Sequence, residues 1–512
     1  MFLEYKLTHL VLFFTIGFIS CNKKEAPTKP NIIIVYMDDL GYGDVSYNGA
    51  KKLKTPNIDA MAMAGMRFNN GYATSATCTP SRYALLTGVY PWREKRARIL
   101  AGTAPLIIGT DQMTLPKMLK QQGYQTAIIG KWHLGLGNGN VNWNELVTPG
   151  PNQLGFDYSY IMAATQDRVP TVYIEDGNVV GLDPNDPIEV NYQKNFEGEP
   201  TGLDNPELLT MKWHHGHNSS IVNGIPRIGF MKGGDAAKWI DIDMADHFLG
   251  GIKKYIKDHK DHPFFLYYPM QQPHVPRTPH PRFEGQSELG PRGDAIVEAD
   301  WSLGELKKTL EVEGILENTL IIFSSDNGPV LNDGYYDDSD VKNGDHTPWG
   351  PFRGGKYSLF EAGTHVPFFT YWKGKIKAGV SNAMVSQLDL FSSLAQLVGS
   401  DVRTDDSLPL MDLLMGKSDQ GRDELVVEAT SRTAFKKGEW VMIPPYKGPS
   451  VNEKVQIELG NYSDFQLYNL AKDIGQKNNL ADSLPKKLQE MLTAFDAIRG
   501  DGYGETKKLE LK

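Results

Sequence analysis

The segment with the most chemical character is residues 78–88, which reads CTPSRYALLTG. Pro80 is typical of the first turn of a helix and Gly88 of its end, so the segment predicts a helix with Cys78 at its N-terminus. Backbone N–H groups at that end of a helix favour an anionic group. The only other cysteine is Cys21, near the start of the chain. A lone cysteine deep in a sequence is either buried and inert or present for chemistry.

Two pairs of oxygen-bearing side chains follow apolar segments that are far apart in the sequence. Asp38 and Asp39 follow one such segment, and Asp326 and Asn327 follow another. Alone, an Asp-Asp pair would be assigned to a turn or a helix cap. Adjacent carboxylates at a buried strand end repel each other and lose hydration, a cost that a hard divalent cation offsets. Four oxygen ligands without a cysteine or histidine cluster favour calcium or magnesium over zinc.

Basic side chains occur in three further short motifs. Lys131 and His133 lie in GKWHLG, Lys356 lies in RGGK and His274 lies in PHVP. The glycines beside each lysine let the backbone approach a ligand closely, and lysine binds anions as a mobile point charge. His274 is suited to binding an ester oxygen or protonating a leaving alcohol. Taken singly, Lys356 is equally a solvated loop charge and His274 a turn residue.

These residues need a scaffold that brings them together, and the apolar periodicity predicts one. Unbroken apolar, β-branched segments are typical of strands buried on both faces, and stretches with helical periodicity lie between them. The alternation predicts an α/β fold with a mostly parallel central sheet flanked by helices. Because reactive residues gather beyond the carboxyl ends of parallel strands, we expect a single pocket. The expected strands are 31–37, 125–129, 264–268, 318–324 and 366–371, and the expected helices are 57–65, 115–123, 244–259 and 295–313.

The C-x-P-S-R-x-x-L-x-T-G pattern resembles the type I sulfatase family, in which that cysteine is oxidised to formylglycine. The resemblance extends from about Asn31 to Asp482 and implies an alkaline-phosphatase-like fold and hydrolysis of sulfate monoesters. Other similar segments are TPNID at 55–59, EAGT at 361–364 and QLYNL at 466–470. His365 and Ala362 depart from the arginine and glycine that the family more often has there.

The resemblance also implies roles for individual residues. A hydrated aldehyde at position 78 carries two hydroxyl groups, of which one attacks sulfur and the other lets the covalent sulfate intermediate collapse. His133 would remove the proton that starts this collapse, and a separate maturation enzyme would make the aldehyde. The implied catalytic residues are Cys78, Arg82, Lys131, His133, His274 and Lys356, and the implied ligands of one Ca²⁺ ion are Asp38, Asp39, the modified Cys78, Asp326 and Asn327.

The first 20 residues predict a lipoprotein-type signal peptide. Lys6 precedes the apolar run 10–19, which is too short to span a bilayer as a helix, and Ser20 then precedes Cys21. We expect Cys21 to become the lipidated first residue and residues 21–30 to form a tether, with an ordinary secretory signal as the alternative. The protein would then be exported, as a lipoprotein of the periplasm, outer membrane or cell surface, and would meet the membrane only through that lipid.

Composition is typical of a globular chain with a large and a small part. The 512 residues are 40% apolar and 22% charged, and the net charge of −9 argues against a nucleic-acid binder, which needs a basic face. We expect a catalytic domain over 31–400 and a smaller α+β C-terminal subdomain over 401–512. Short strands at 425–428 and 440–443 and a helix at 484–498 predict the latter.

Residues 158–234 are rich in Gly, Pro, Asn and Asp, and we expect their loops to shape the substrate cleft. Within them, QDR at 166–168 and HHGH at 214–217 are candidate cleft residues. The three histidines could also bind zinc, but their spacing fits no usual zinc pattern. The acidic loop from Asp333 to Asp345 is interpreted as solvated surface in preference to a cleft rim.

The expected substrate is a sulfated polysaccharide or its oligosaccharides, either algal, such as ulvan or carrageenan, or a host glycan. Two alternatives stay open. One is a phosphonate or phosphate monoester hydrolase of the same superfamily. The other is a surface glycan-binding lipoprotein without catalysis, although such a protein would be expected to lose some of the anion-binding residues, all of which are present here.

Overall fold

The computed structural model describes Met1 and residues 29–499, so the predicted lipidation site at Cys21 and almost all of the signal and tether lie outside the described residues. Within this part, ten strands form one mixed sheet in the order β14-β2-β13-β12-β1-β11-β3-β4-β5-β6. The strands are β1 (Asn31–Met37), β2 (Met66–Tyr72), β3 (Gln125–Lys131), β4 (Tyr158–Met162), β5 (Tyr173–Glu175), β6 (Asn178–Val179), β11 (Phe264–Pro269), β12 (Thr319–Ser325), β13 (Phe369–Tyr371) and β14 (Gly379–Ser386). No helix in the described part is both long and apolar enough to cross a bilayer.

The five central strands, β12-β1-β11-β3-β4, run parallel to one another. Ile33 of β1 pairs with Leu266 of β11 on one side and Ile321 of β12 on the other. Antiparallel strands β13 and β5 flank this central group. The predicted α/β architecture is therefore confirmed, with the difference that the strand expected at 366–371 begins at Phe369 and runs antiparallel.

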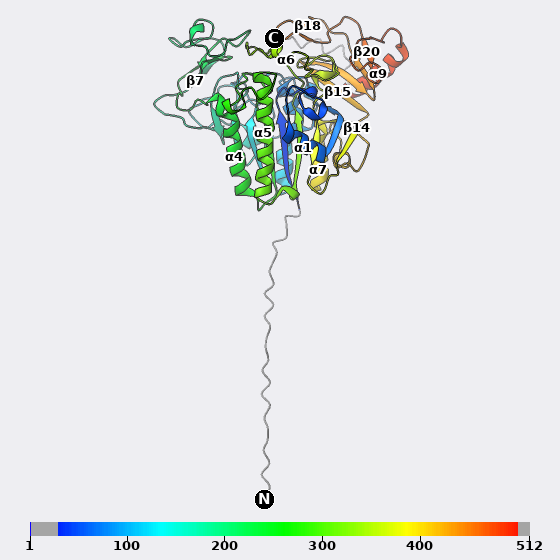
Figure 1. Cartoon of the computed structure of the whole chain (residues 1–512), viewed down its shortest axis with the longest axis horizontal. Helices are drawn as coiled ribbons and strands as arrows, with labels where there is room; N and C mark the ends of the chain where they lie inside the picture. Colours follow the sequence, from blue (N-terminus) through cyan, green and yellow to red (C-terminus); the bar gives the residue numbers. More distant parts are fainter. Residues whose placement is uncertain (2–28, 500–512) are drawn as a thin grey trace.

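Alternate residues of β1 enter two separate cores. Ile32 and Ile34 pack on the side of α2, α3 and α7, whereas Ile33 and Val35 pack on the side of α1, α4 and α5. Helices α4 and α5 lie side by side on their face of the sheet (Figure 1). Burial on both faces explains why β1 is apolar at almost every position. The helices are α1 (Pro56–Ala64), α2 (Cys78–Thr87), α3 (Leu115–Gln121), α4 (Met244–His259), α5 (Pro291–Val312) and α7 (Leu390–Val398).

The C-terminal part is a four-stranded antiparallel sheet covered by one helix. Strands β15 (Glu424–Ala429), β16 (Arg432–Lys437), β17 (Trp440–Ile443) and β20 (Gln466–Asn469) pair in that order, and α9 (Pro485–Arg499) packs on them. Val426 and Phe435 of this sheet share one apolar cluster with Tyr72 of β2 and Leu359. The two parts are thus joined by a common core, and the boundary expected at residue 400 stays a prediction.

The long region between 158 and 234 contains more regular structure than expected. Its strands β4, β5 and β6 extend the central sheet, and two small two-stranded antiparallel sheets follow. One pairs β7 (Glu189–Asn191) with β10 (Phe230–Lys232), and the other is a hairpin of β8 (Ile221–Val222) with β9 (Ile225–Pro226). Figure 1 places β7, together with α6 (Ser339–Asn343) and β18 (Val451–Asn452), above the carboxyl end of the sheet. This cover is where a substrate cleft is expected.

Candidate active site

The carboxyl ends of four adjacent parallel strands carry residues that were expected to do chemistry. Asp38 and Asp39 follow β1, and Asp326 follows β12. Lys131 ends β3, and His274 lies in the turn after β11. Because β12, β1, β11 and β3 are neighbours in the sheet, these side chains meet at one edge, as the sequence predicts.

A compact acidic cluster lies at this edge. One ligand atom each from Asp38, Asp39, Asp326 and Cys78 lies within 4.8 Å of the others, and all four residues are at most 2% exposed. The amide of Asn327 donates from Nδ2 to Oδ1 of Asp39 at 2.7 Å, whereas its own Oδ1 is buried without a partner. A buried acceptor without a partner is unfavourable and is usually explained by an ion or a water.

The charge balance of this cluster also favours a cation. The pKa of Asp38 is raised to about 8, first by burial and then by the negative charge of Asp326, although Lys131 lowers it. Keeping these carboxylates ionised side by side therefore requires additional positive charge. Carboxylate and amide oxygens suit a hard divalent ion such as Ca²⁺ or Mg²⁺. The residues present fit such an ion.

Cys78 is the first residue of α2, and Gly88 ends that helix with a φ of 66° and an N–H bond to the carbonyl of Ala84, which confirms the predicted helix. The Sγ atom of Cys78 lies 3.6 Å from Oδ1 of Asp38. Burial raises the pKa of this thiol well above its usual range. A buried, protonated thiol is a poor nucleophile, so the position makes chemical sense for a residue that is converted to another group.

Arg82 lies one turn further along α2 and is fully buried. Its Nε and Nη2 donate to the same oxygen of Asp326, at 3.1 and 2.7 Å, and Nη2 lies 3.9 Å from Oδ1 of Asp38. Arginine suits this position because its planar fork keeps a fixed charge and orients a carboxylate. The helix that carries Cys78 is thereby fixed to the end of β12.

The two lysines are buried against the acidic cluster. Lys131 forms an ion pair with Asp38, and Lys356 Nζ donates to Oδ2 of Asp39 at 2.8 Å. Gly130, with a φ of 135°, precedes Lys131, and a Cβ there would lie 2.0 Å from the carbonyl oxygen of Pro269. Both lysines are at most 2% exposed, so the interpretation of Lys356 as a solvated loop charge is wrong.

The two histidines expected in the site are both buried, and each has a lysine nearby that affects its pKa. Burial and then Lys131 lower the pKa of His133 well below its usual range, and its Nδ1 is buried without a partner while Nε2 lies 3.0 Å from the carbonyl of Leu100. Burial and then Lys356 likewise lower the pKa of His274, whose Nε2 lies 3.9 Å from Oδ2 of Asp39. Both rings are therefore neutral before substrate binds and able to accept a proton.

A family model described as Sulfatase matches residues 30–400. The chain belongs to the sulfatase family. It is 47% identical over 490 residues to the N-acetylgalactosamine-6-O-sulfatase of Bacteroides thetaiotaomicron, which covers 94% of this chain and 96% of that protein. It is 29% identical over 494 residues to human arylsulfatase A, which covers 92% of this chain and 87% of the human protein. The predicted activity is confirmed at this level, because the family hydrolyses sulfate monoesters.

The fold comparison agrees. A solved sulfatase from a study of the metabolism of multiple glycosaminoglycans by Bacteroides thetaiotaomicron superposes with a TM-score of 0.91 at 47% identity, covering 92% of this chain and 99% of that one. The phosphonate monoester hydrolase of Agrobacterium radiobacter superposes with a TM-score of 0.57 at 17% identity, covering 92% and 96%, and shares the fold alone. The alkaline-phosphatase-like fold is thus confirmed, whereas the roles of single residues in this sulfatase stay predictions.

One residue of the sulfatase site was missed in the sequence. The acidic loop 333–345 was interpreted as solvated surface, which is wrong for Asp333, since its carboxylate Oδ2 lies 2.8 Å from Lys356 Nζ in the site. It is also wrong for Asp337, whose side chain is 3% exposed and pairs with Arg277 at 2.8 Å. Burial raises the pKa of Asp333, but Lys356 and His274 together hold it below its usual range. The side chains of Asp338 and Asp345 are 66% and 90% exposed, as expected of a surface.

The candidate cleft residues of the sulfatase come together in part. Asp167 is buried, accepts from His217 Nε2 at 2.8 Å and pairs with Arg168 at 2.9 Å. His214 and His215 lie against each other, with their Nδ1 atoms 2.7 Å apart. Among the described residues, the groups with metal-binding geometry include none of these histidines, which argues against the zinc alternative. The cluster instead offers a buried carboxylate and guanidinium to a polar ligand.

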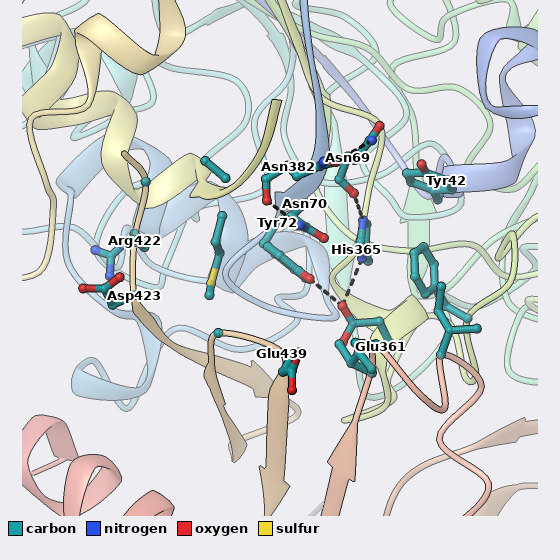
Figure 2. A pocket seen from close by; sticks show the side chains of 18 of the residues that line it. Tyr42, Asn69, Asn70, Tyr72, Glu361, His365, Asn382, Arg422, Asp423 and Glu439 are labelled. Atoms are coloured by element: carbon teal, nitrogen blue, oxygen red, sulfur yellow. Dashed lines mark hydrogen bonds and ion pairs between the residues drawn. The ribbon is translucent and has the colours of Figure 1, made fainter. Parts of the chain in front are cut away.

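His365, which departs from the family pattern, lines a cavity of about 860 Å³ between the central sheet and the C-terminal sheet (Figure 2). Glu361 is the centre of a buried network there: it accepts from Tyr72 at 2.6 Å, from His365 Nδ1 at 3.0 Å, and from Lys436. His365 Nε2 also contacts the carbonyl of Asn69 at 2.6 Å. The histidine therefore belongs to a structural network that anchors the segment after Lys356, and the predicted site residues do not line this cavity.

Proposed function

We propose that this sulfatase removes the 6-O-sulfate group from N-acetylgalactosamine in oligosaccharides derived from glycosaminoglycans. The observation that carries the proposal is the nearly full-length similarity to the N-acetylgalactosamine-6-O-sulfatase of Bacteroides thetaiotaomicron. The proposal narrows the earlier expectation of algal or host glycans to a host-type amino sugar. Two groups support catalysis in it: Cys78 converted to formylglycine, and one Ca²⁺ ion held by Asp38, Asp39, Asp326, Asn327 and the modified Cys78.

The charge of the sulfate ester must be neutralised before attack on sulfur. A bound Ca²⁺ would polarise a sulfate oxygen and lower the pKa of a hydroxyl group beside it. Lys131 and Lys356 would bind further sulfate oxygens. Each of them already contacts one ligand carboxylate, Asp38 or Asp39, and lysine has three N–H donors, so donors remain for the sulfate. Such donors, fixed in a site without bulk water, act more strongly than the same groups in water.

Proton transfer is assigned to the two histidines. His274 Nδ1 lies 2.7 Å from the carbonyl of Val275, which it can reach only as an N–H donor, so Nε2 is the free acceptor. The negative charge of a bound sulfate ester favours protonation of that nitrogen, which then donates to the leaving oxygen. His133, neutral and with a free Nδ1, accepts the proton from the hydroxyl group at position 78.

A substrate comparison tests the proposal. Purified enzyme with intact modification would be offered matched 6-sulfated N-acetylgalactosamine, 4-sulfated N-acetylgalactosamine and 6-sulfated N-acetylglucosamine, with released sulfate measured. We expect kcat/KM to be highest for the first substrate by at least roughly tenfold, because a pocket built for one hydroxyl configuration rejects its epimer. Faster release from another sugar would overturn the assignment. Faster hydrolysis of an aryl phosphonate than of an aryl sulfate would favour the phosphonate hydrolase alternative.

We also propose that the protein is exported and held at a membrane by a lipid on Cys21, and that a separate maturation enzyme oxidises Cys78. The signal pattern before Cys21 and the burial of Cys78 support these two steps. Growth of expressing cells with a labelled fatty acid should label the wild-type chain but not Cys21→Ser. Mass measurement of the peptide that contains residue 78 should show an aldehyde in place of the thiol. An unlabelled wild-type chain, or an unchanged thiol in active enzyme, would contradict the respective step.

A further inference from the structure

The loop that carries Asp333 is fixed by the histidine-rich segment of the cleft. Tyr335 forms an antiparallel bridge with Trp213, and His214 N donates to the carbonyl of Gly334 at 2.7 Å. Gly334 has a φ of 105°, and a Cβ there would lie 1.9 Å from Nδ1 of His217. Only glycine therefore lets the two segments approach so closely. The position of the preceding residue, Asp333, is set by this contact.

The carboxylate of Asp333 is directed toward the reacting end of the site. Its Oδ2 lies 2.8 Å from Lys356 Nζ, and ligand atoms of Asp39, His274 and Asp333 lie within 4.8 Å of one another. Its other contacts are weak, because the hydroxyl of Tyr357 lies 3.3 Å from each of its oxygens. The side chain of Asp333 is 11% exposed, whereas the side chains of Asp39 and Lys356 beside it are at most 2% exposed.

Binding of the sulfate group does not explain why the carboxylate of Asp333 lies beside Lys356. Asp39 already neutralises Lys356, and a second negative charge beside a sulfate-binding lysine opposes the binding of an anion. A second cation between Asp39 and Asp333 is disfavoured, because the ammonium of Lys356 lies between them. Proximity to His274, to which the proposed function assigns protonation of the leaving oxygen, instead places Asp333 beside the alcohol half of the substrate.

We propose that Asp333 is a specificity-determining residue, which accepts a hydrogen bond from an uncharged hydroxyl or amide N–H beside the sulfate ester and excludes sugars with a second anionic group at that place. The proposal rests on the proposed function and deepens it. It predicts that the enzyme prefers sugars that carry a single sulfate group. A neutral donor satisfies the free lone pairs of the carboxylate, whereas a second sulfate there would meet a buried like charge.

The test compares wild type with Asp333→Asn on N-acetylgalactosamine 6-sulfate, its 4,6-disulfate and an aryl sulfate that lacks sugar hydroxyls. The matched control is Asp338→Asn, the same change at an exposed position of the same loop. We expect the Asp333 variant to lose about 10- to 100-fold in kcat/KM on the monosulfate, from loss of a charge-assisted hydrogen bond. The loss on the aryl sulfate should be at least roughly tenfold smaller, and the ratio of disulfate to monosulfate activity should rise at least roughly tenfold.

Equal losses on all three substrates would overturn the proposal, because Asp333 would then act only through Lys356. An unchanged disulfate ratio would overturn it as well. If Asp333→Asn does not fold, Asp333→Ser and wild-type kinetics on a 4-deoxy 6-sulfated sugar serve instead, and equal wild-type rates with and without that hydroxyl would contradict hydrogen bonding by Asp333. If another sulfated sugar proves to be the substrate, the proposed function fails, while the mono- and disulfated forms of that sugar still test Asp333.

Discussion

Arg82 and Asp326 lie 244 residues apart in the chain and form a fully buried ion pair, with two guanidinium nitrogens 3.1 and 2.7 Å from one carboxylate oxygen. This pair joins the helix of Cys78 to the strand end that supplies Asp326 and Asn327 to the site. Removing one member leaves the other charged and buried, which is far more costly than losing an exposed pair.

We therefore expect Arg82→Met to lower the free energy of unfolding by roughly 3–5 kcal/mol in urea denaturation. The control is Arg96→Met, because the side chain of Arg96 is 56% exposed and pairs with Glu94 on the surface. That change should cost less than about 1 kcal/mol. Equal unfolding midpoints for the two variants would show that the buried pair is not a determinant of stability.

Cys78→Ser should bind sulfated substrate but fail to turn over. A serine can attack sulfur once, but it lacks the second hydroxyl group that lets the covalent sulfate leave. Steady-state sulfate release should fall at least roughly 10³-fold, with at most one equivalent of sulfate retained on the protein by mass measurement. Sustained turnover by this variant would refute the assignment of position 78.

The free amide oxygen of Asn327 is expected to be a metal ligand. Asn327→Leu removes that oxygen and should weaken calcium binding at least roughly tenfold in calorimetric titration, while abolishing much of the rise in Tm that calcium gives the wild type. Asn185→Leu, on an exposed loop, is the control. A chelator should lower both Tm and activity of the wild type, and calcium should restore both. Unaltered calcium affinity in the Asn327 variant would exclude it from the ligand set.

Lys436 and Lys437 are adjacent in β16 and offer a matched pair. Lys436 is 2% exposed and pairs with buried Glu361, whereas the side chain of Lys437 is 37% exposed and pairs with Glu424. Lys436→Met should cost roughly 3–5 kcal/mol of unfolding free energy, and Lys437→Met less than about 1 kcal/mol. Glu361 lies at the end of segment 356–361, which begins with the sulfate-binding Lys356. The Lys436→Met change should therefore also lower kcat. A stable Lys436 variant with normal kcat would rule out this anchoring role.

We expect Glu361 to make the free energy of unfolding depend on pH in the acid range. Burial raises its pKa, but Lys436 and His365 outweigh burial and hold the pKa at about 2, against 4.5 for an unperturbed side chain. A lowered pKa in the folded state gives stability that is fully present above pH 4.5 and is lost as the pH falls toward 2. The difference in unfolding free energy between wild type and Glu361→Gln should therefore shrink over that range in urea denaturation. A difference that does not vary with pH would show that Glu361 is not the titrating group.

Most of the site could be predicted because its residues directly follow strands with strong sequence signals. Asn31–Met37 was predicted with the bounds that β1 has, and the polar residues after it needed only the general rule about strand ends. Asp333 could not be predicted in this way. Its position depends on the contact between Gly334 and His217, which come from loops without periodicity, and Asp338 of the same loop is exposed.

The network around His365 was also beyond sequence analysis. The departure from the family pattern was visible, but Tyr72 and Lys436, which share Glu361 with His365, belong to β2 and to the C-terminal sheet. Strand β2 has no continuous apolar pattern, since Asn69 is exposed and Phe68 buried within it. The pairing of such a strand is decided by neighbours that the local sequence does not reveal.

Cys78 is only 2% exposed, and the strand ends that enclose it come from opposite halves of the chain. During synthesis or export, the helix of Cys78 emerges long before β12 can join the sheet. If a second protein oxidises this thiol, it has access only in that interval, while the chain is still open. Faster folding would shorten the time for activation, so the yield of working enzyme is set by a kinetic competition and not by stability alone.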